Sequence, residues 1–108
     1  MANYLLIESR DPFELKGFAQ RSELASLLVA DGSGVTIFLV ENAVLAARAG
    51  AKLRELDKLA KSGVEILADE FALQERGIAA GDIASAVKPS KVDALIARLA
   101  AGAKAIWN

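Results

Sequence analysis

The chain has 108 residues and a mass of 11.4 kDa, and 54% of its residues are hydrophobic and 25% charged. This balance excludes intrinsic disorder, which requires few apolar residues and a large net charge. Basic and acidic residues nearly cancel to a net charge of −1, so the basic excess typical of nucleic-acid binders is missing. The chain has no cysteine and no histidine, which excludes disulfides, thiolate nucleophiles, His–Cys zinc sites and histidine general bases. We expect no cofactor.

Length and hydropathy predict where the protein resides and how it associates. The chain is long enough for one core, so we expect a single domain over residues 1–108. Its longest apolar stretch, Val35–Val40, is far shorter than the roughly 20 residues of a membrane-spanning helix. The start of the chain lacks the basic segment and cleavage site of a signal peptide, which predicts a cytoplasmic protein. A mean hydropathy of +0.32 is high for so small a body and indicates contact with another subunit.

Four short segments are typical of strands. Tyr4–Ile7, Val35–Val40 and Val64–Ala68 are continuous apolar runs, which favour strands buried on both faces. Lys104–Trp107 is a candidate for a short last strand.

The first helix is predicted between the first two strands. Asp11 can cap its free amides, Pro12 suits the first helical position, and Glu14 completes a capping box. The helix should end near 31–34, where two glycines follow each other closely. Its buried stripe is predicted to comprise Leu15, Phe18, Ser22, Ala25 and Val29, with Leu24 and Leu28 alongside.

Three more helical regions follow. The second strand leads into Ala43–Ala49 and, after Gly50, into Lys52–Lys61. Asp69 is expected to cap a short helix over Phe71–Arg76, which Gly77 ends. A loop then covers 78–88, with one helical turn expected at 83–87. The last helix should begin at a capping box, Ser90 to Asp93, and bury its apolar residues Val92, Leu95, Ile96 and Leu99.

The alternation of strands and helices predicts an α/β fold: a three-layer, flavodoxin-like, mostly parallel sheet of about four or five strands with helices on both faces. We expect the first strand to lie between the second and the third. Ligands of such sheets bind beyond the carboxyl ends of the strands, where the strand order reverses. The cleft is therefore predicted between Ser9–Asp11 and Asp69–Glu70, with Glu41–Asn42 on its flank. Its candidate residues are Ser9, Arg10, Asp11, Glu41, Asn42, Asp69 and Glu70.

Each candidate also has a structural explanation. Asp69 and Glu70, with Glu41 and Asp11 near them, could hold a hard cation such as magnesium, but their spacing is no metal signature. A helix cap at Asp69 and a dipole interaction at Glu70 also explain these two residues, and we favour this explanation. Arg10 beside a helix start could attract an anion, yet no glycine loop follows the strand, so we do not expect nucleotide binding.

Trp107 either closes the core or anchors a contact between subunits. We favour the second interpretation, because tryptophan is enriched at the centres of interfaces.

The order of these segments resembles the DsrE/DsrF/DsrH-like family, which includes the Tus sulfur-relay subunits. The resemblance covers most of the chain. It rests on the turn Asp11-Pro12-Phe13, on Gly34 to Phe38 followed by Glu41 to Val44, on Gly63 to Ile66, and on Arg76-Gly77-Ile78. Ala43 stands where the family has a glycine.

The resemblance implies an α/β subunit that assembles into trimers or hexamers, often with its own paralogues. Active members carry sulfur as a persulfide on a cysteine just after the third strand, and that position corresponds to Asp69 here. A carboxylate cannot form a persulfide, because this chemistry needs a thiolate. The chain is therefore expected to lack the family's sulfur-carrier activity and not to be an enzyme of that kind.

Two functions remain open. The first is a non-catalytic DsrE-like subunit, a structural or regulatory partner in a homo- or hetero-oligomer linked to sulfur metabolism. Its partners would be further copies, DsrE-like paralogues or sulfurtransferases, and neither nucleic acid nor a membrane. The second is a small-ligand or divalent-metal-binding α/β module that uses the carboxylates of the cleft.

Overall fold

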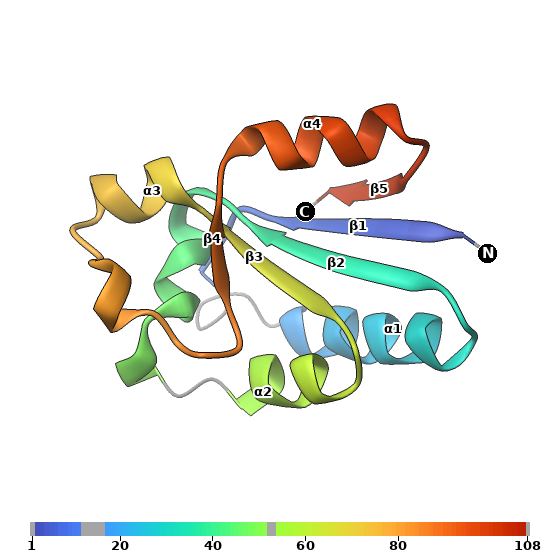
Figure 1. Ribbon diagram of the computed structural model, residues 1–108. Coiled ribbons are helices and arrows are strands. Elements are labelled where there is room, and N and C mark those ends of the chain that lie inside the picture. Colours follow the sequence, from blue (N-terminus) through green and yellow to red (C-terminus); the bar gives the residue numbers. More distant parts are fainter. Residues whose placement is uncertain (1, 12–16, 52–53, 108) are drawn as a thin grey trace.

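The computed structural model describes residues 2–11, 17–51 and 54–107, and its centre is a five-stranded, fully parallel sheet (Figure 1). The α/β, flavodoxin-like architecture predicted from the sequence is confirmed. All three apolar runs form strands, Lys104–Trp107 forms a fourth, and a three-residue strand at 88–90 was not predicted. The strands are β1 (Asn3–Glu8), β2 (Gly34–Leu39), β3 (Glu65–Asp69), β4 (Lys88–Ser90) and β5 (Lys104–Trp107).

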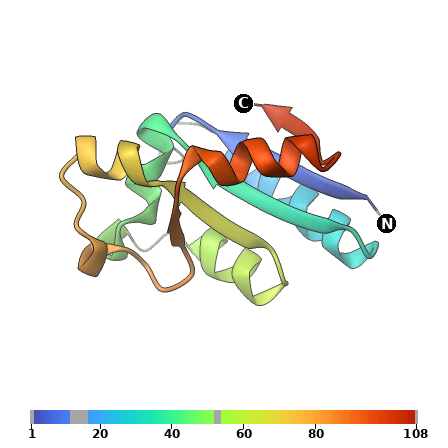
Figure 2. The same cartoon turned by 45° about the horizontal axis from the view of Figure 1, so that its top comes forward.

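The strand order differs from the expected one. It is β4-β3-β2-β1-β5. Thus β2 lies between β1 and β3, whereas β1, which was expected between β2 and β3, lies between β2 and β5. The chain adds strands in one direction from β1 to β4 and then returns across the sheet through α4 (Val92–Ala100) to place β5 beside β1. Because such crossovers are right-handed, this reversal puts α4 on the opposite face from α1 (Phe18–Ala30) and α2 (Arg54–Lys61), as Figures 1 and 2 show.

The helix α1 buries the stripe that its spacing predicts. Phe18, Ser22 and Ala25 are buried, whereas Val29 of the predicted stripe is only half-buried. Of the two flanking leucines, Leu28 is half-buried and Leu24 is exposed because it points away from the stripe. The predicted start of this helix, from Pro12 to Leu15, lies outside the described residues.

The segment after β2 is not the α-helix that its alanines suggest. Glu41–Ala47 forms a 3₁₀ helix, η1, and Ala49–Ala51 a second one, η2. The buried residues of η1 are spaced three apart, Ala43 with Ala46 and Val44 with Ala47, which suits three residues per turn. The α-helical prediction continues correctly only in α2, where Leu56 and Leu59 are buried, while 52–53 lie outside the described residues.

The short helix α3 (Glu70–Glu75) forms as predicted, and Gly77 follows it with a φ of +67°. The helical turn expected at 83–87 is a single turn, in which the amide of Val87 donates to the carbonyl of Ala84 at 3.0 Å, and an additional 3₁₀ turn, η3 (Ala80–Asp82), precedes it. Ile83 forms an isolated antiparallel bridge with Arg48, and the amide of Ala84 donates to the carbonyl of Ala47 at 2.8 Å. Ile83 is extended, so the turn begins at Ala84, one residue later than predicted.

Two predictions about α4 are wrong. Ser90 does not cap it: Ser90 ends β4, and its hydroxyl donates to the carbonyl of Lys91 at 3.2 Å. Of the four apolar residues expected to be buried, only Leu95 is. The other three are exposed, Val92 at 46%, Ile96 at 59% and Leu99 at 41%. The helix rests on the sheet along one narrow side, and we call these three residues the α4 stripe.

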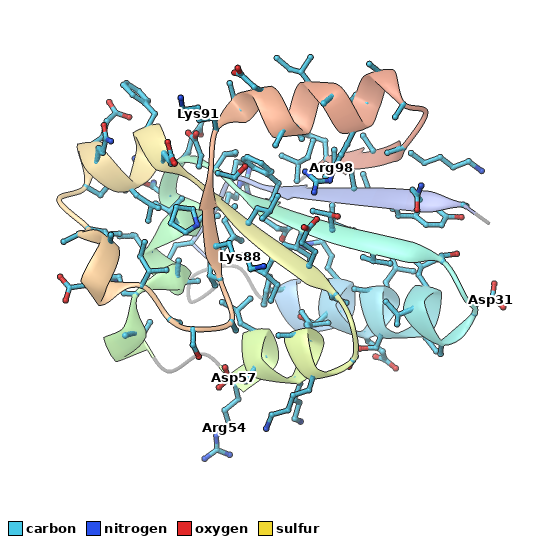
Figure 3. All side chains as sticks on the ribbon, in the orientation of Figure 1. Asp31, Arg54, Asp57, Lys88, Lys91 and Arg98 are labelled. Carbon is cyan, nitrogen blue, oxygen red and sulfur yellow. The ribbon has the colours of Figure 1, made fainter. Side chains whose placement is uncertain are left out.

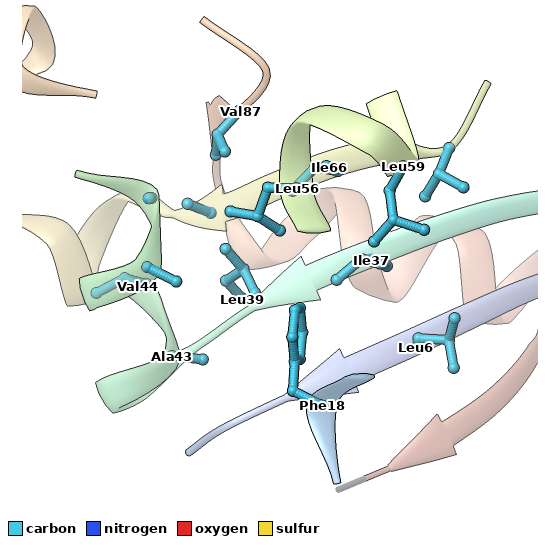
Figure 4. Close-up of a cluster of buried hydrophobic side chains, with 14 of the residues drawn as sticks. Leu6, Phe18, Ile37, Leu39, Ala43, Val44, Leu56, Leu59, Ile66 and Val87 are labelled. Atoms are coloured by element: carbon cyan, nitrogen blue, oxygen red, sulfur yellow. The ribbon is translucent and has the colours of Figure 1, made fainter. Parts of the chain in front are cut away.

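The core is therefore unequal on the two faces of the sheet. The larger cluster fills the space between the sheet and α1, α2 and η1, where Phe18, Leu39 and Leu56 meet (Figure 4). The smaller cluster lies under α4 and consists of Leu5, Ile7, Phe38, Leu67 and Leu95. Beside it, Arg98 reaches from α4 toward the sheet and pairs with Glu65 at 2.6 Å (Figure 3). Within the described residues, no helix is long and apolar enough to cross a membrane.

Candidate functional site

The carboxyl ends of the strands form a row in which the predicted cleft residues can be placed. Along this edge, Glu41 follows β2 and lies between the ends of β1 and β3. The pair Glu41–Asn42 thus stands in the middle of the edge and not on its flank. Successive strands are added on one side up to β4, and the next strand, β5, is added on the opposite side of the sheet, beside β1. At the end of β3 and β4, where this reversal occurs, lies a hollow of about 280 Å³. It is lined by Asp69, Glu70, Phe71, Gln74, Lys91, Val92 and Asp93.

Asp69 is a helix cap. Its Oδ2 accepts a hydrogen bond of 3.3 Å from the amide of Ala72, as expected of a residue that begins a helix. Glu70 occupies the first turn of α3, where a carboxylate interacts favourably with the helix dipole. Both carboxylates therefore have a structural role, and both also line the hollow.

Asn42 and Arg76 connect two elements of the edge. The side-chain oxygen of Asn42 accepts from Nε of Arg76 at 3.2 Å and from Nη2 at 2.9 Å. Nη1 of the same guanidinium donates to the carbonyl of Ala72 at 3.2 Å. Asn42 was a sequence candidate, whereas Arg76 was predicted to end a helix and belongs to a segment that carries the family resemblance, but it was not a site candidate. No local pattern indicates their contact, because 34 residues separate them.

The chain makes a strained turn between β2 and η1. Glu41 has a φ of +50°, in the left-handed region that a residue other than glycine seldom occupies. Its side chain is exposed. This conformation directs the chain from β2 into η1 and places Asn42 opposite Arg76.

The end of β1 carries the remaining candidates. Arg10 is exposed, and Ser9 and Asp11 are half-buried. The turn that follows lies outside the described residues, so the expectation that this segment binds no nucleotide stays a prediction.

A buried ion pair near this edge was missed by sequence reasoning. Glu8 is 2% exposed, and its Oε1 accepts from Nε of Arg21 at 2.6 Å. Its Oε2 is buried without a hydrogen-bond partner. Burial raises the pKa of the Glu8 carboxyl, and Arg21 opposes this shift only in part. Glu8 directly follows an apolar run, so the sequence suggests a polar residue at the point where the chain leaves the sheet, and not a buried ion pair.

The carboxylates of the described residues do not converge on one point. No group of three or more Asp or Glu residues in this part of the chain is arranged to hold a metal ion. Of the seven candidates, only Asp69 and Glu70 line the hollow at the end of β3.

Trp107 lies on the outer strand of the sheet and is 65% exposed. In the parallel register it pairs with Ile7, whose side chain belongs to the cluster under α4. Paired residues of neighbouring strands project to the same face, so Trp107 and α4 share one side of the molecule.

Comparison with known proteins identifies the fold. No protein-family model matches the chain, and neither does any curated protein. Among solved structures, the protein of unknown function MTH1491 from Methanobacterium thermoautotrophicum has a TM-score of 0.87 at 17% identity, with both chains fully covered. The ychN protein from E. coli has a TM-score of 0.86 at 19% identity, again over both full chains. BT1422 from Bacteroides thetaiotaomicron, also of unknown function, has a TM-score of 0.77 at 18% identity, covering 98% of this chain and 94% of its own. At these identities the likeness establishes a common fold.

Proposed function

We propose that the chain is a non-catalytic subunit of a cytoplasmic homo- or hetero-oligomer, in which it acts as a structural or regulatory partner. The observation that carries this proposal is the α4 stripe together with Trp107. These four large apolar side chains are exposed on one side of the molecule. Fully burying a large apolar side chain contributes about 1.5–3 kcal/mol, and these four are already partly covered, so covering their exposed parts offsets a share of the cost of association.

The arrangement fits a protein interface better than a ligand cleft. The three residues of the α4 stripe are spaced four and three apart, which places them on one side of a helix. Trp107 lies on a strand with an open edge, and large aromatic side chains frequently anchor interfaces. We expect the partner to be another copy of this chain or a paralogue of the same fold.

The link to sulfur metabolism rests on the resemblance to DsrE-like proteins. The residue at the position of the family's sulfur-carrying cysteine is Asp69, whose carboxylate caps α3. With no cysteine in the chain, a persulfide would have to reside on a partner. The chain would then complete a trimer or hexamer and position cysteine-bearing paralogues or sulfurtransferases.

The test is the mass and composition of the intact complex. The tagged chain would be purified from its native organism and measured by native mass spectrometry. We expect either an integer multiple of the 11.4 kDa subunit or a mixed assembly with cysteine-bearing subunits of the same fold, and any persulfide mass on those subunits alone. A monomer at micromolar concentration without such partners would contradict the proposal.

A second candidate function is binding of a small ligand at the reversal of strand order. The hollow of about 280 Å³ favours it, because Asp69, Glu70 and Lys91 bring charges of both signs to its walls. A ligand that binds only the folded state must raise the melting temperature. Unchanged melting with divalent cations and with small charged metabolites would exclude this function.

A further inference from the structure

A second and larger hollow lies at the same end of the molecule, between η2 and the segment that joins α3 to η3. Its volume is about 510 Å³, within the range of roughly 300–1,000 Å³ typical of small-molecule sites. One wall is formed by 48–51 and the other by 76–78 together with Asp82. None of the cleft candidates from the sequence lines it.

Arg48 lines this hollow and has unused hydrogen-bond donors. Its Nε donates to the carbonyl of Leu45 at 2.8 Å, which fixes the guanidinium close to its own helix. Among the described residues, no carboxylate lies within ion-pair distance of it, and no hydrogen bond uses its two terminal nitrogens. A guanidinium held in this way offers its terminal N–H groups to a ligand.

Arg76 on the opposite wall is held still more firmly. Asn42 accepts from its Nε and Nη2, and the carbonyl of Ala72 accepts from its Nη1. The nearest carboxylate oxygen, on the more exposed Glu75, is 3.8 Å away, so this pair is weak. Fixing the side chain before binding lowers the entropy that a ligand contact would cost.

The residues that line the hollow carry a net positive charge, and the backbone of both walls is accessible from it. Two arginines and one aspartate, Asp82, are among its lining residues, which gives the lining a formal net charge of +1. A Cβ added at Gly50 or Gly77 would meet nothing within 4 Å, so the backbone on both walls is accessible. The neighbouring Arg54 extends away from the body of the protein and contributes no contact here (Figure 3).

From this geometry we propose that the hollow binds a small molecule through a doubly charged oxyanion, a phosphate or sulfate group, with Arg48 and Arg76 as its cationic contacts. Planar guanidinium groups match the oxygen spacing of such anions and can donate two parallel hydrogen bonds. A pair of them favours a dianion over a single carboxylate. The site is independent of the α4 stripe, so it goes beyond the proposed function.

The experiment is a titration followed by two-dimensional NMR of the ¹⁵N-labelled full-length chain. Inorganic phosphate, sulfate and phenyl phosphate would be added separately at constant ionic strength maintained with sodium chloride. We expect saturable shifts of the backbone amides of 48–51 and 76–82. Tighter binding of phenyl phosphate than of phosphate would identify a phosphorylated organic ligand, whereas equal binding would identify the free anion.

Two variants and a control make the result decisive. Arg48→Gln should weaken binding about tenfold or more, the effect expected on losing a hydrogen bond to a charged group. It should leave the melting temperature unchanged, because the Arg48 side chain makes one exposed hydrogen bond with the described residues and its backbone bonds are retained in the variant. Arg76→Gln should also weaken binding, and Lys61→Gln, which removes an exposed charge from α2, should not. Absence of saturation, or equal affinity of Arg48→Gln and the parent protein, would overturn the proposal.

Discussion

At the scale of single residues, Glu8 makes stability depend on pH. Burial raises its pKa above the ordinary value of 4.5, so the folded state retains a proton that the unfolded chain has already released. The contribution of this retained proton to the free energy of unfolding is complete below pH 4.5 and is lost as the pH rises through the pKa of Glu8 in the folded state.

We therefore expect that the stability of Glu8→Gln does not fall in this way as the pH rises. Urea unfolding of both proteins between pH 4 and 7 should show the parent protein losing stability relative to the variant as the pH rises. Parallel curves over the whole range would contradict the raised pKa of Glu8.

Asp69 allows a second prediction at this scale. Its carboxylate accepts one backbone hydrogen bond, so Asp69→Ala should cost about 1 kcal/mol, whereas Asp69→Asn keeps an acceptor and should cost little. Urea titrations of both variants measure this. A gain in stability in Asp69→Asn would instead show that Asp69 repels neighbouring carboxylates in a functional pocket.

At the scale of elements, the end of α3 depends on one glycine. Gly77 has a φ of +67° and open space around its Cβ position, so Gly77→Ala should cost about 1 kcal/mol through backbone strain alone. Gly81 also has open space but no positive φ, and Gly81→Ala is the matched control. Equal melting temperatures of the two variants would contradict a strained backbone at Gly77.

The elements also show how far the sequence could predict the structure. Four of the five strands of the described residues and the cap at Asp69 are encoded locally, in short apolar segments and in a single side chain, and were predicted, whereas β4 has no such signal. The α4 stripe was predicted to be buried, because its spacing is that of a buried face. How much of a helix is covered depends on the sheet beneath it, which local spacing does not reveal. The Asn42–Arg76 bond and the Glu8–Arg21 pair were missed for the same reason, since each joins distant segments.

At the scale of the whole molecule, strand order decides which residues meet. The return of the chain after β4 places β5 at the outer edge and leaves Trp107 and the α4 stripe on one side of the molecule. The pattern of apolar segments predicted the parallel sheet but not the order of its strands. That order depends on the side on which each connecting segment packs against the sheet, which the local pattern does not reveal. The exposed apolar side that results is the basis of the proposed assembly.

The central claim is that this side is covered by another subunit, and light scattering of the purified chain over a range of concentrations tests it most directly. Three proteins would be compared: the parent chain, Ile96→Lys, and the control Ala97→Lys, which introduces the same charge at an exposed position of the same helix. We predict an oligomer for the parent chain and for Ala97→Lys, and a folded monomer for Ile96→Lys. A monomeric parent chain at micromolar concentration, or the same oligomer in all three proteins, would contradict the claim.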